Sequence, residues 1–343
     1  MTGGCSATGA GAAAGWFLRR AFDLVQERRD DLALLMTLEM GKPLAEANGE
    51  VTYGGEFLRW FSEEAVRILG EIGTAPSGTN RMLVIRQPVG VSLFITPWNF
   101  PIAIPAWKMA PALAFGNAVV IKPADLVPAS VWALVEIISR TAMPKGVVNL
   151  AMGRGSVVGQ TLLDSRDVAA ISFTGSVETG ARVAAACAAR GAKFQLEMGG
   201  KNPLVVLDDA NLDAAVAAAI DGAYYQTGQR CTASSRLIVQ KGIHDAFVDR
   251  MVAAMKALKV DHALKDGTII GTIIGIIFCR NIVAIQHFVE DITGGQVFDS
   301  SVFMLATLPD TIDWGDVTRV VLLALILSLL ATLYPSWRAA RTD

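Results

Sequence analysis

Three side chains in this sequence have the types and local settings that nucleophilic catalysis needs: Cys231, Glu197 and Asn99. Cys231 follows the segment 228–230 (Gly-Gln-Arg), a turn that would leave the thiol accessible, and the neighbouring arginine would favour the thiolate. Glu197 stands before a Gly-Gly turn in an apolar stretch, where a raised pKa would suit a general base. Asn99 could donate its side-chain amide to a developing oxyanion.

Each of these residues also has an ordinary structural interpretation. A free cysteine is most often buried and inert, and Cys5, Cys187 and Cys279 keep that interpretation. Glu197 could be a solvated residue at the end of a strand. Asn99 could form an Asx turn, which is the commonest use of asparagine in such a loop.

The elements that would position these residues alternate between helix and strand. Apolar residues recur at helical spacing in 16–40 and 51–69, and Gly41 and Pro43 should end the first helix. We expect further elements in the following order: two strands in 81–96, a strand in 117–125, a helix in 131–142, strands in 146–153 and 168–176, a helix in 177–189, and two strands around a Gly-Gly turn in 193–207. This alternation predicts an α/β fold with a doubly wound parallel sheet, which binds ligands beyond the carboxyl ends of its strands.

Composition excludes several classes of protein. The 343 residues carry 30 Lys and Arg against 32 Asp and Glu, a net charge of −2, so we expect no nucleic-acid partner. Four cysteines without a CxxC pair, and three histidines, give neither a disulfide scaffold nor a metal site. Hydrophobic residues make up 52% of the chain, so membrane segments have to be considered.

Five motifs follow one another along the chain: TPWNFP at 96–101, IKPAD at 121–125, FTGS at 173–176, LEMGGKNP at 196–203 and GQRCTA at 228–233. In this order and spacing, residues 16–267 resemble the aldehyde dehydrogenase superfamily. The stretches WKMAPAL, ARGAKFQLEMGGKNP and GQRCTASSRLIVQ look most like its semialdehyde branch. α-Ketoglutaric semialdehyde (2,5-dioxopentanoate) dehydrogenases are the nearest match, and succinate-semialdehyde dehydrogenases come next.

The resemblance implies roles for the three catalytic candidates. Cys231 would attack a short aldehyde to form a thiohemiacetal, which becomes a thioester when hydride leaves to NAD or NADP. Glu197 would activate the hydrolytic water, which favours release of a free acid over transfer to coenzyme A. Asn99 would hold the oxyanion together with the backbone N–H of Cys231.

The resemblance also implies where the cofactor binds. Lys122 and Asp125 look like contacts to the adenosine ribose, although the family more often has Glu at the second position. An acidic group accepts a hydrogen bond from the ribose 2′-OH and repels a 2′-phosphate, so Asp125 favours NAD over NADP. Lys108 would be a further polar contact near the cofactor, with a surface lysine as the alternative.

Several neighbouring residues complete the expected cofactor and substrate sites. The glycines among them could equally be plain turn residues. The remaining expected cofactor contacts are Pro97, Trp98, Gly155, Gly159, Gly175 and Ser176. Trp98 and Trp107 would line the substrate tunnel.

The sequence predicts four regions: a disordered tail at 1–15, a dinucleotide-binding domain at 16–197, a truncated catalytic domain at 198–267 and a membrane segment at 268–343. The family's E-x-F-G-P stretch and its subunit-joining strand have no counterpart, although the family is typically homo-oligomeric. Residues 295–309, 312–317 and 327–341 resemble the C-terminal end of lipoprotein-releasing ABC transporter permeases, with a long buried helix in a soluble domain as the alternative. We therefore expect a cytoplasmic enzyme portion with inner-membrane attachment through 268–343. The alternative function is an inactive, membrane-attached fusion of two gene fragments.

Overall fold

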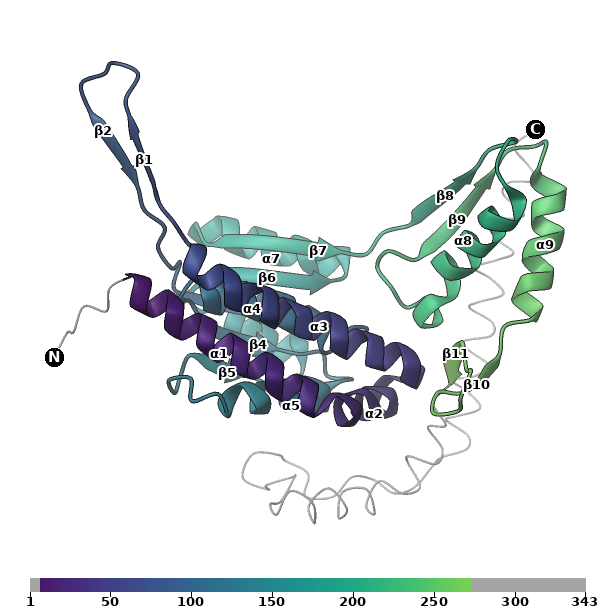
Figure 1. Cartoon of the computed structure of the whole chain (residues 1–343), viewed down its shortest axis with the longest axis horizontal. Coiled ribbons are helices and arrows are strands. Elements are labelled where there is room, and N and C mark those ends of the chain that lie inside the picture. Colours follow the sequence, from purple (N-terminus) through teal and green to yellow (C-terminus); the bar gives the residue numbers. More distant parts are fainter. Residues whose placement is uncertain (1–6, 273–343) are drawn as a thin grey trace, which may run out of the picture. The chain divides into compact units, whose positions relative to one another are not determined.

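The computed structural model describes residues 7–272 of the chain. These residues belong to one unit, Met1–Ile273 (Figure 1). The permease-like stretches expected at 295–309, 312–317 and 327–341 lie outside the described residues.

A five-stranded, all-parallel sheet forms the centre of this unit, in the order β5-β4-β3-β6-β7. The strands are β3 (Val91–Ile95), β4 (Ala118–Lys122), β5 (Val148–Leu150), β6 (Val168–Gly175) and β7 (Lys193–Met198). From β3 the chain adds β4 and β5 on one side and then β6 and β7 on the other, so the strand order reverses beside β3. This topology confirms the predicted doubly wound α/β fold.

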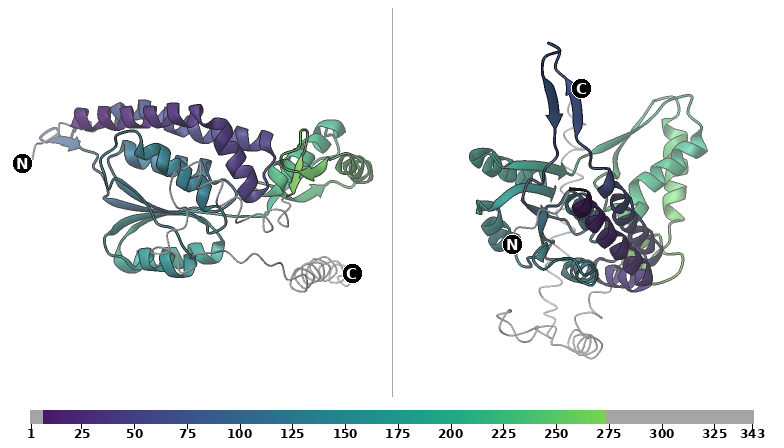
Figure 2. Two further views of the ribbon diagram at one scale, coloured as in Figure 1. Left: turned by 90° about the horizontal axis from the view of Figure 1, so that it is seen from below. Right: turned by 60° about the vertical axis from the view of Figure 1, so that its left-hand side comes forward.

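Apolar side chains on both faces of the sheet explain its layers. Leu93 of β3 packs with Ile171 and Val183 in the core on one face, whereas its neighbour Phe94 packs with Ile121 in the core on the other. Successive residues of a strand point to opposite faces, and a parallel sheet buries both. Helices therefore cover the sheet on each side (Figure 2).

Five helices pack over the first face: α1 (Ala7–Glu27), α2 (Arg29–Met40), α3 (Leu44–Glu64), α4 (Ala103–Ala114) and α5 (Pro128–Ser139). Two helices cover the second: α6 (Gln160–Asp164) and α7 (Val177–Arg190). Helix α2 ends as predicted at Gly41, which has a left-handed φ of 75° and donates its N–H to the carbonyl of Thr37.

The N-terminal prediction was wrong in two respects. Residues 7–15, expected in a disordered tail, belong to α1. A Cβ added at Gly11 or Gly15 would lie 2.6 Å from the carbonyl oxygen of Ala65 or Ser62, so these glycines allow a close approach to the end of α3. The helix expected over 16–40 is also divided, because Arg28 departs from helical geometry between α1 and α2.

A second, smaller layer follows the central sheet. Strands β8 (Asn202–Val206) and β9 (Ser234–Val239) pair in parallel, and α8 (Leu212–Tyr224) and α9 (His244–Lys256) pack on them around a separate apolar core. The two strands expected around the Gly-Gly turn are therefore β7 and β8, which belong to different sheets.

Strand β11 (Ile270–Thr272) lies beyond the boundary expected near residues 266–268. It pairs in parallel with β10 (Val260–His262), and Gly271 donates its N–H to Thr227 Oγ1 at 3.3 Å. The start of the segment expected as a membrane region is thus part of the same unit as the sheet. Within residues 7–272, no helix combines the length and apolar character needed to cross a bilayer.

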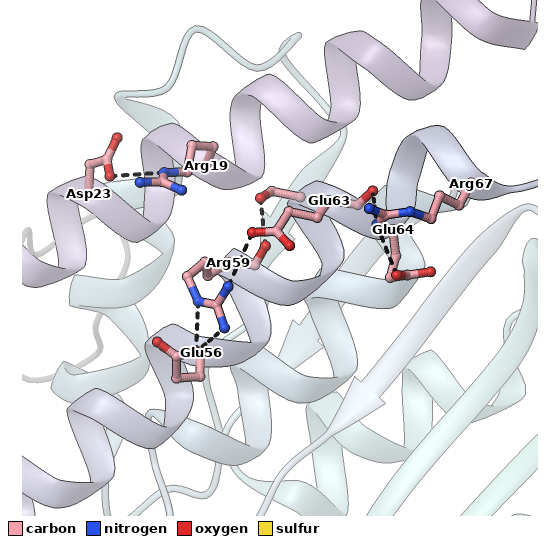
Figure 3. Close-up of polar contacts among 8 residues, drawn as sticks. Arg19, Asp23, Glu56, Arg59, Glu63, Glu64 and Arg67 are labelled. Carbon is pink, nitrogen blue, oxygen red and sulfur yellow. Dashed lines mark hydrogen bonds and ion pairs between the residues drawn. The ribbon is translucent and has the colours of Figure 1, made fainter.

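Two further surface features complete the described chain. The antiparallel hairpin of β1 (Glu71–Thr74) and β2 (Arg81–Val84) extends away from the helices in Figure 1 and exposes Ile72 and Leu83. The outward surface of α1 and α3 carries short-range ion pairs, which Figure 3 shows in detail. They are Arg19–Asp23, Arg59 with Glu56 and Glu63, and Arg67–Glu64.

Candidate active site

The carboxyl ends of three adjacent strands bring together most of the predicted site. The TPWNFP loop follows β3, Lys122 ends β4, and Gly175 ends β6. Because these strands are parallel neighbours, their carboxyl ends lie along one edge of the sheet. The strand order reverses at this edge, which is where doubly wound sheets bind ligands.

Lys122 and Asp125 contact each other at the end of β4. The Lys122 ammonium is buried, donates to the carbonyl of Pro123 at 2.7 Å and forms an ion pair with the carboxylate of Asp125. The Asp125 side chain is nearly half exposed. A buried cation beside an accessible carboxylate offers both a donor and an acceptor, which fits the hydroxyls of a ribose.

The predicted glycine-rich turns lie on two neighbouring segments of the same fold. Gly155–Gly159 forms a single π-helical turn that leads into α6, and Ser176 caps α7 by accepting a hydrogen bond from the N–H of Thr179 at 3.3 Å. A Cβ added at Gly155 or Gly159 would meet no atom within 4 Å among the described residues. The N-terminus of α7 has the charge preference that a pyrophosphate needs.

Asn99 joins the loop after β3 to the loop that carries Cys231. Its Nδ2 donates to the carbonyl of Gln229 at 2.8 Å, two residues before the cysteine. Its Oδ1 is buried and has no hydrogen-bond partner in the part of the chain that the structure describes. The Asx-turn alternative is therefore wrong, and one of the two Nδ2 hydrogens remains for an oxyanion.

The Cys231 thiol is exposed, so the buried and inert interpretation is wrong for this residue. Its carbonyl accepts a hydrogen bond from Asn202 Nδ2 at 2.7 Å, which fixes the backbone of the turn. Arg230 donates to the carbonyls of Asp221 and Gly222 at 2.7 and 3.0 Å. The guanidinium expected to favour the thiolate is therefore engaged at the end of α8.

Glu197 lies within β7, opposite Thr174 of β6, and not in an apolar turn. The strand continues to Met198, and the Glu197 side chain is exposed and accepts a hydrogen bond from Gln195 Nε2 at 2.7 Å. It makes no hydrogen bond with Cys231 or Asn99 among residues 7–272. A hydrogen bond thus joins Asn99 to the loop that carries Cys231, whereas Glu197 lies on β7, apart from that loop.

Lys108 of α4 is buried, so the surface-lysine alternative is wrong. Burial lowers the pKa of Lys108 to about 8, and the negative charge of Glu197 opposes that shift. A row of hydrogen bonds connects the two side chains, from Lys108 to Ser172, from Ser172 to Gln195 and from Gln195 to Glu197. The lysine is therefore electrostatically coupled to the candidate base.

Of the two expected tunnel residues, Trp107 is the better defined. Its ring lies edge-on to Phe57 and Tyr53 of α3, at centroid distances of 5.9 and 6.3 Å. Trp98 and Trp107 are both half-buried. Trp107 thus helps to pack α4 on α3, and a role in a substrate tunnel stays a prediction.

Sequence reasoning missed a buried ion pair that holds the Asn99 loop. Lys42 and Glu50 pair with both side chains fully buried, and Lys42 Nζ also donates to the carbonyl of Asn99 at 2.9 Å. Lys42 precedes the start of α3 and Glu50 follows it, eight residues later. In the sequence, charged residues at such positions look like ordinary surface residues. The small residues around Glu50 were the available signal that this carboxylate is buried.

Comparison with known proteins agrees with this fold. A family model described as "Aldehyde dehydrogenase family" matches residues 13–295. The chain belongs to the aldehyde dehydrogenase family. The match continues past Gly267, where the resemblance was expected to end.

Curated relatives belong to the semialdehyde branch. A glutarate-semialdehyde dehydrogenase of Pseudomonas putida is 42% identical over 85% of this chain and 62% of its own length. An alpha-ketoglutaric semialdehyde dehydrogenase of Bacillus subtilis is 44% identical over 77% of this chain and 54% of its own. The succinate-semialdehyde dehydrogenase [NADP(+)] GabD of Escherichia coli is 44% identical over 75% and 53%.

A solved structure has a similar fold. The crystal structure of PnpE in complex with nicotinamide adenine dinucleotide superposes with a TM-score of 0.74 at 36% identity, over 83% of this chain and 58% of that one. The chain thus spans between a half and two thirds of the length of these relatives.

Proposed function

We propose that this chain oxidises a short semialdehyde to the carboxylic acid with NAD or NADP as the hydride acceptor. The observation that carries this proposal is the hydrogen bond from Asn99 to the carbonyl of Gln229, since it holds an amide donor beside the loop of an exposed cysteine. An oxyanion donor placed next to a nucleophile is the arrangement that acyl chemistry needs.

The reaction begins at the Cys231 thiolate, which adds to the aldehyde carbon and forms a tetrahedral thiohemiacetal. The second Nδ2 hydrogen of Asn99 and the backbone N–H of Cys231 hold the oxyanion. NAD or NADP, when bound, would supply the hydride acceptor for this oxidation, and the carbonyl then re-forms on Cys231. The resulting thioester keeps the acyl group on Cys231.

Hydrolysis then releases the acid and restores the thiolate. The Glu197 carboxylate takes a proton from water, hydroxide adds to the thioester carbon, and the carbon–sulfur bond breaks. Lys108 is connected to Glu197 by hydrogen bonds through Ser172 and Gln195.

For the cofactor, Lys122 and Asp125 would hold the adenosine ribose. Pro97, Trp98, Gly155, Gly159, Gly175, Ser176 and Lys108 would line the remainder of its site. Asp125 favours NAD, because a 2′-phosphate would approach a carboxylate. One relative is named as an NADP(+) enzyme and one similar structure is a complex with nicotinamide adenine dinucleotide, so the experiment uses both cofactors.

Three substrates are indicated by the names of the relatives: glutarate semialdehyde, α-ketoglutaric semialdehyde and succinate semialdehyde. All three carry a carboxylate at the end opposite the aldehyde. The test is reduced-cofactor formation by the full chain with each of them, beside Cys231→Ala. Turnover that requires Cys231 supports the proposal, and equal turnover by the folded Cys231→Ala variant contradicts it.

A further inference from the structure

The corner between α2 and α3 carries a buried ion pair that the chemistry above does not use. The side chains of Lys42 and Glu50 are both fully buried. Such a pair contributes little net stability, because desolvation of the two charges offsets their attraction. Burial lowers the pKa of Lys42, and the charge of Glu50 opposes this shift. The contacts beyond the pair indicate what it does.

The pair holds the Asn99 loop from both sides. Lys42 Nζ donates to the carbonyl of Asn99 at 2.9 Å. Glu50 Oε1 accepts the backbone N–H groups of Ile102 and Ala103, at 2.9 and 3.1 Å, in the first turn of α4. One side chain therefore fixes the loop at Asn99, and the other fixes the helix start that follows it.

A third residue of the same corner, Glu46, faces the loop that precedes Cys231. Burial raises the pKa of Glu46, and a hydrogen bond from the backbone of Gln226 acts in the opposite direction. Gln226 and Thr227 both adopt left-handed backbone conformations, with φ of 53° and 57°. Such conformations are strained for residues other than glycine and persist only where their surroundings hold them.

We propose that Lys42, Glu46 and Glu50 are positioning residues that hold the Asn99 loop and the Cys231 loop at a fixed separation. This inference rests on the proposed function. The hydrogen bond from Asn99 to the carbonyl of Gln229 requires that the two loops stay at this separation. A displacement of about 1 Å in a catalytic group can cost about 100-fold in rate.

The first test is the double variant Lys42→Met/Glu50→Gln, which removes both buried charges at nearly constant volume. We expect kcat to fall by about 10- to 100-fold. The KM for NAD should change less than kcat, because the adenosine-ribose contacts Lys122 and Asp125 lie at the end of β4, and the Asn99 loop supplies only Pro97 and Trp98 to the cofactor site. Hydrogen exchange of peptides covering 96–103 and 225–231 should become faster in the folded full-length chain.

The second test separates the contact from the charge at Glu46. Glu46→Ala removes the acceptor that faces Gln226, whereas Glu46→Gln keeps an acceptor and removes only the charge. We expect slower turnover and faster exchange of 225–231 in the first variant, and recovery of most of both in the second. This pair also decides the question if the double variant does not fold.

Glu39 supplies a matched control. It is a half-buried carboxylate that accepts the backbone N–H groups of Ala129 and Ser130 at the start of α5, much as Glu50 does at the start of α4. Glu39→Gln should lower thermal stability without changing kcat or the exchange of the two loops. Glu56→Gln, on the outward surface of α3, controls for an exposed charge (Figure 3).

Two results would overturn the positioning role. One is wild-type kcat and wild-type loop exchange in the double variant and in Glu46→Ala. The other is an equal loss of kcat in Glu39→Gln at the same thermal stability. If the wild-type chain forms no NADH or NADPH, the proposed function fails, and the exchange of the two loops still decides the positioning role.

Discussion

Lys108 gives a quantitative test of the site, because the structure buries it beside a candidate catalytic carboxylate. Replacing it with methionine removes the ammonium group and roughly conserves the volume. The burial that lowers the pKa of Lys108 to about 8, from 10.5, also makes its charged form unfavourable in the folded chain. We therefore expect the effect of Lys108→Met on stability to depend on pH.

The size of the effect follows from the pKa shift. At about 1.4 kcal/mol for each pKa unit, the charged Lys108 costs the folded state about 3 kcal/mol at pH values below 8. Because the folded-state pKa is the lower one, this cost is complete below 8 and disappears as the pH rises through 8 toward 10.5. Lys108→Met should raise the free energy of unfolding relative to the wild type, and that advantage should shrink by about 2 kcal/mol between pH ~7 and pH ~10.

Urea unfolding of both proteins at the two pH values measures this quantity. Other groups that titrate over the same range cancel in the difference between variant and wild type. Lys145→Met, at an exposed position, controls for the removal of a positive charge from the chain. A difference between Lys108→Met and wild type that does not change with pH would refute the burial argument.

Three further predictions concern the catalytic loop, the cofactor site and the N-terminal helix. Asn99→Ala should lower kcat by about 100- to 1000-fold with little change in the KM for substrate, as steady-state kinetics would show; an unchanged kcat contradicts the oxyanion role. Asp125→Asn should shift the ratio of kcat/KM values toward NADP, and a ratio that stays constant removes Asp125 from cofactor selection. Gly15→Leu should lower the Tm, because its Cβ would lie 2.6 Å from the carbonyl of Ser62; an unchanged Tm would mean that α1 does not pack there.

The strands of the central sheet, in their order along the chain, could be predicted from the sequence because each depends on a local pattern of residues. The apolar runs around Leu93, Val120 and Ile171 indicated buried parallel strands, and the motifs at their ends marked the ligand edge. The positions of Lys122 and Asp125 follow from the same rule, since parallel neighbours end at one edge. Local sequence patterns were therefore sufficient to predict the parallel strands and the residues at their carboxyl ends.

Contacts between distant segments could not be predicted in this way. Gly11 and Gly15 lie in a stretch of small residues typical of a flexible tail, and it is their close approach to Ala65 and Ser62 that the sequence pattern does not reveal. Lys42, between α2 and α3, and Glu50 of α3 are buried where the loop before α4 and the start of α4 pack against them, which the periodicity of α3 does not reveal. The strand at 270–272 likewise depends on pairing with β10 and on a hydrogen bond to Thr227.

The sequence predicted the environment of Cys231 correctly and that of Glu197 wrongly, because the second depends on contacts between distant segments. The sequence predicted an accessible thiol after the turn at 228–230, and Cys231 is exposed. Glu197 was expected in an apolar turn, but pairing of β7 with β6 extends the strand through it and exposes its side chain. Lys108 was missed as a buried partner of Glu197, because its contact with Ser172 crosses from a helix to the sheet.

The most direct test of the central claim is reduced-cofactor formation by the purified full chain with succinate, glutarate and α-ketoglutaric semialdehydes. Each is assayed with NAD and with NADP, beside Cys231→Ala. The account predicts NADH or NADPH formation that requires Cys231 and is faster with NAD than with NADP. Formation at an equal rate by folded Cys231→Ala, or none from folded wild type with any of the three substrates, would contradict it.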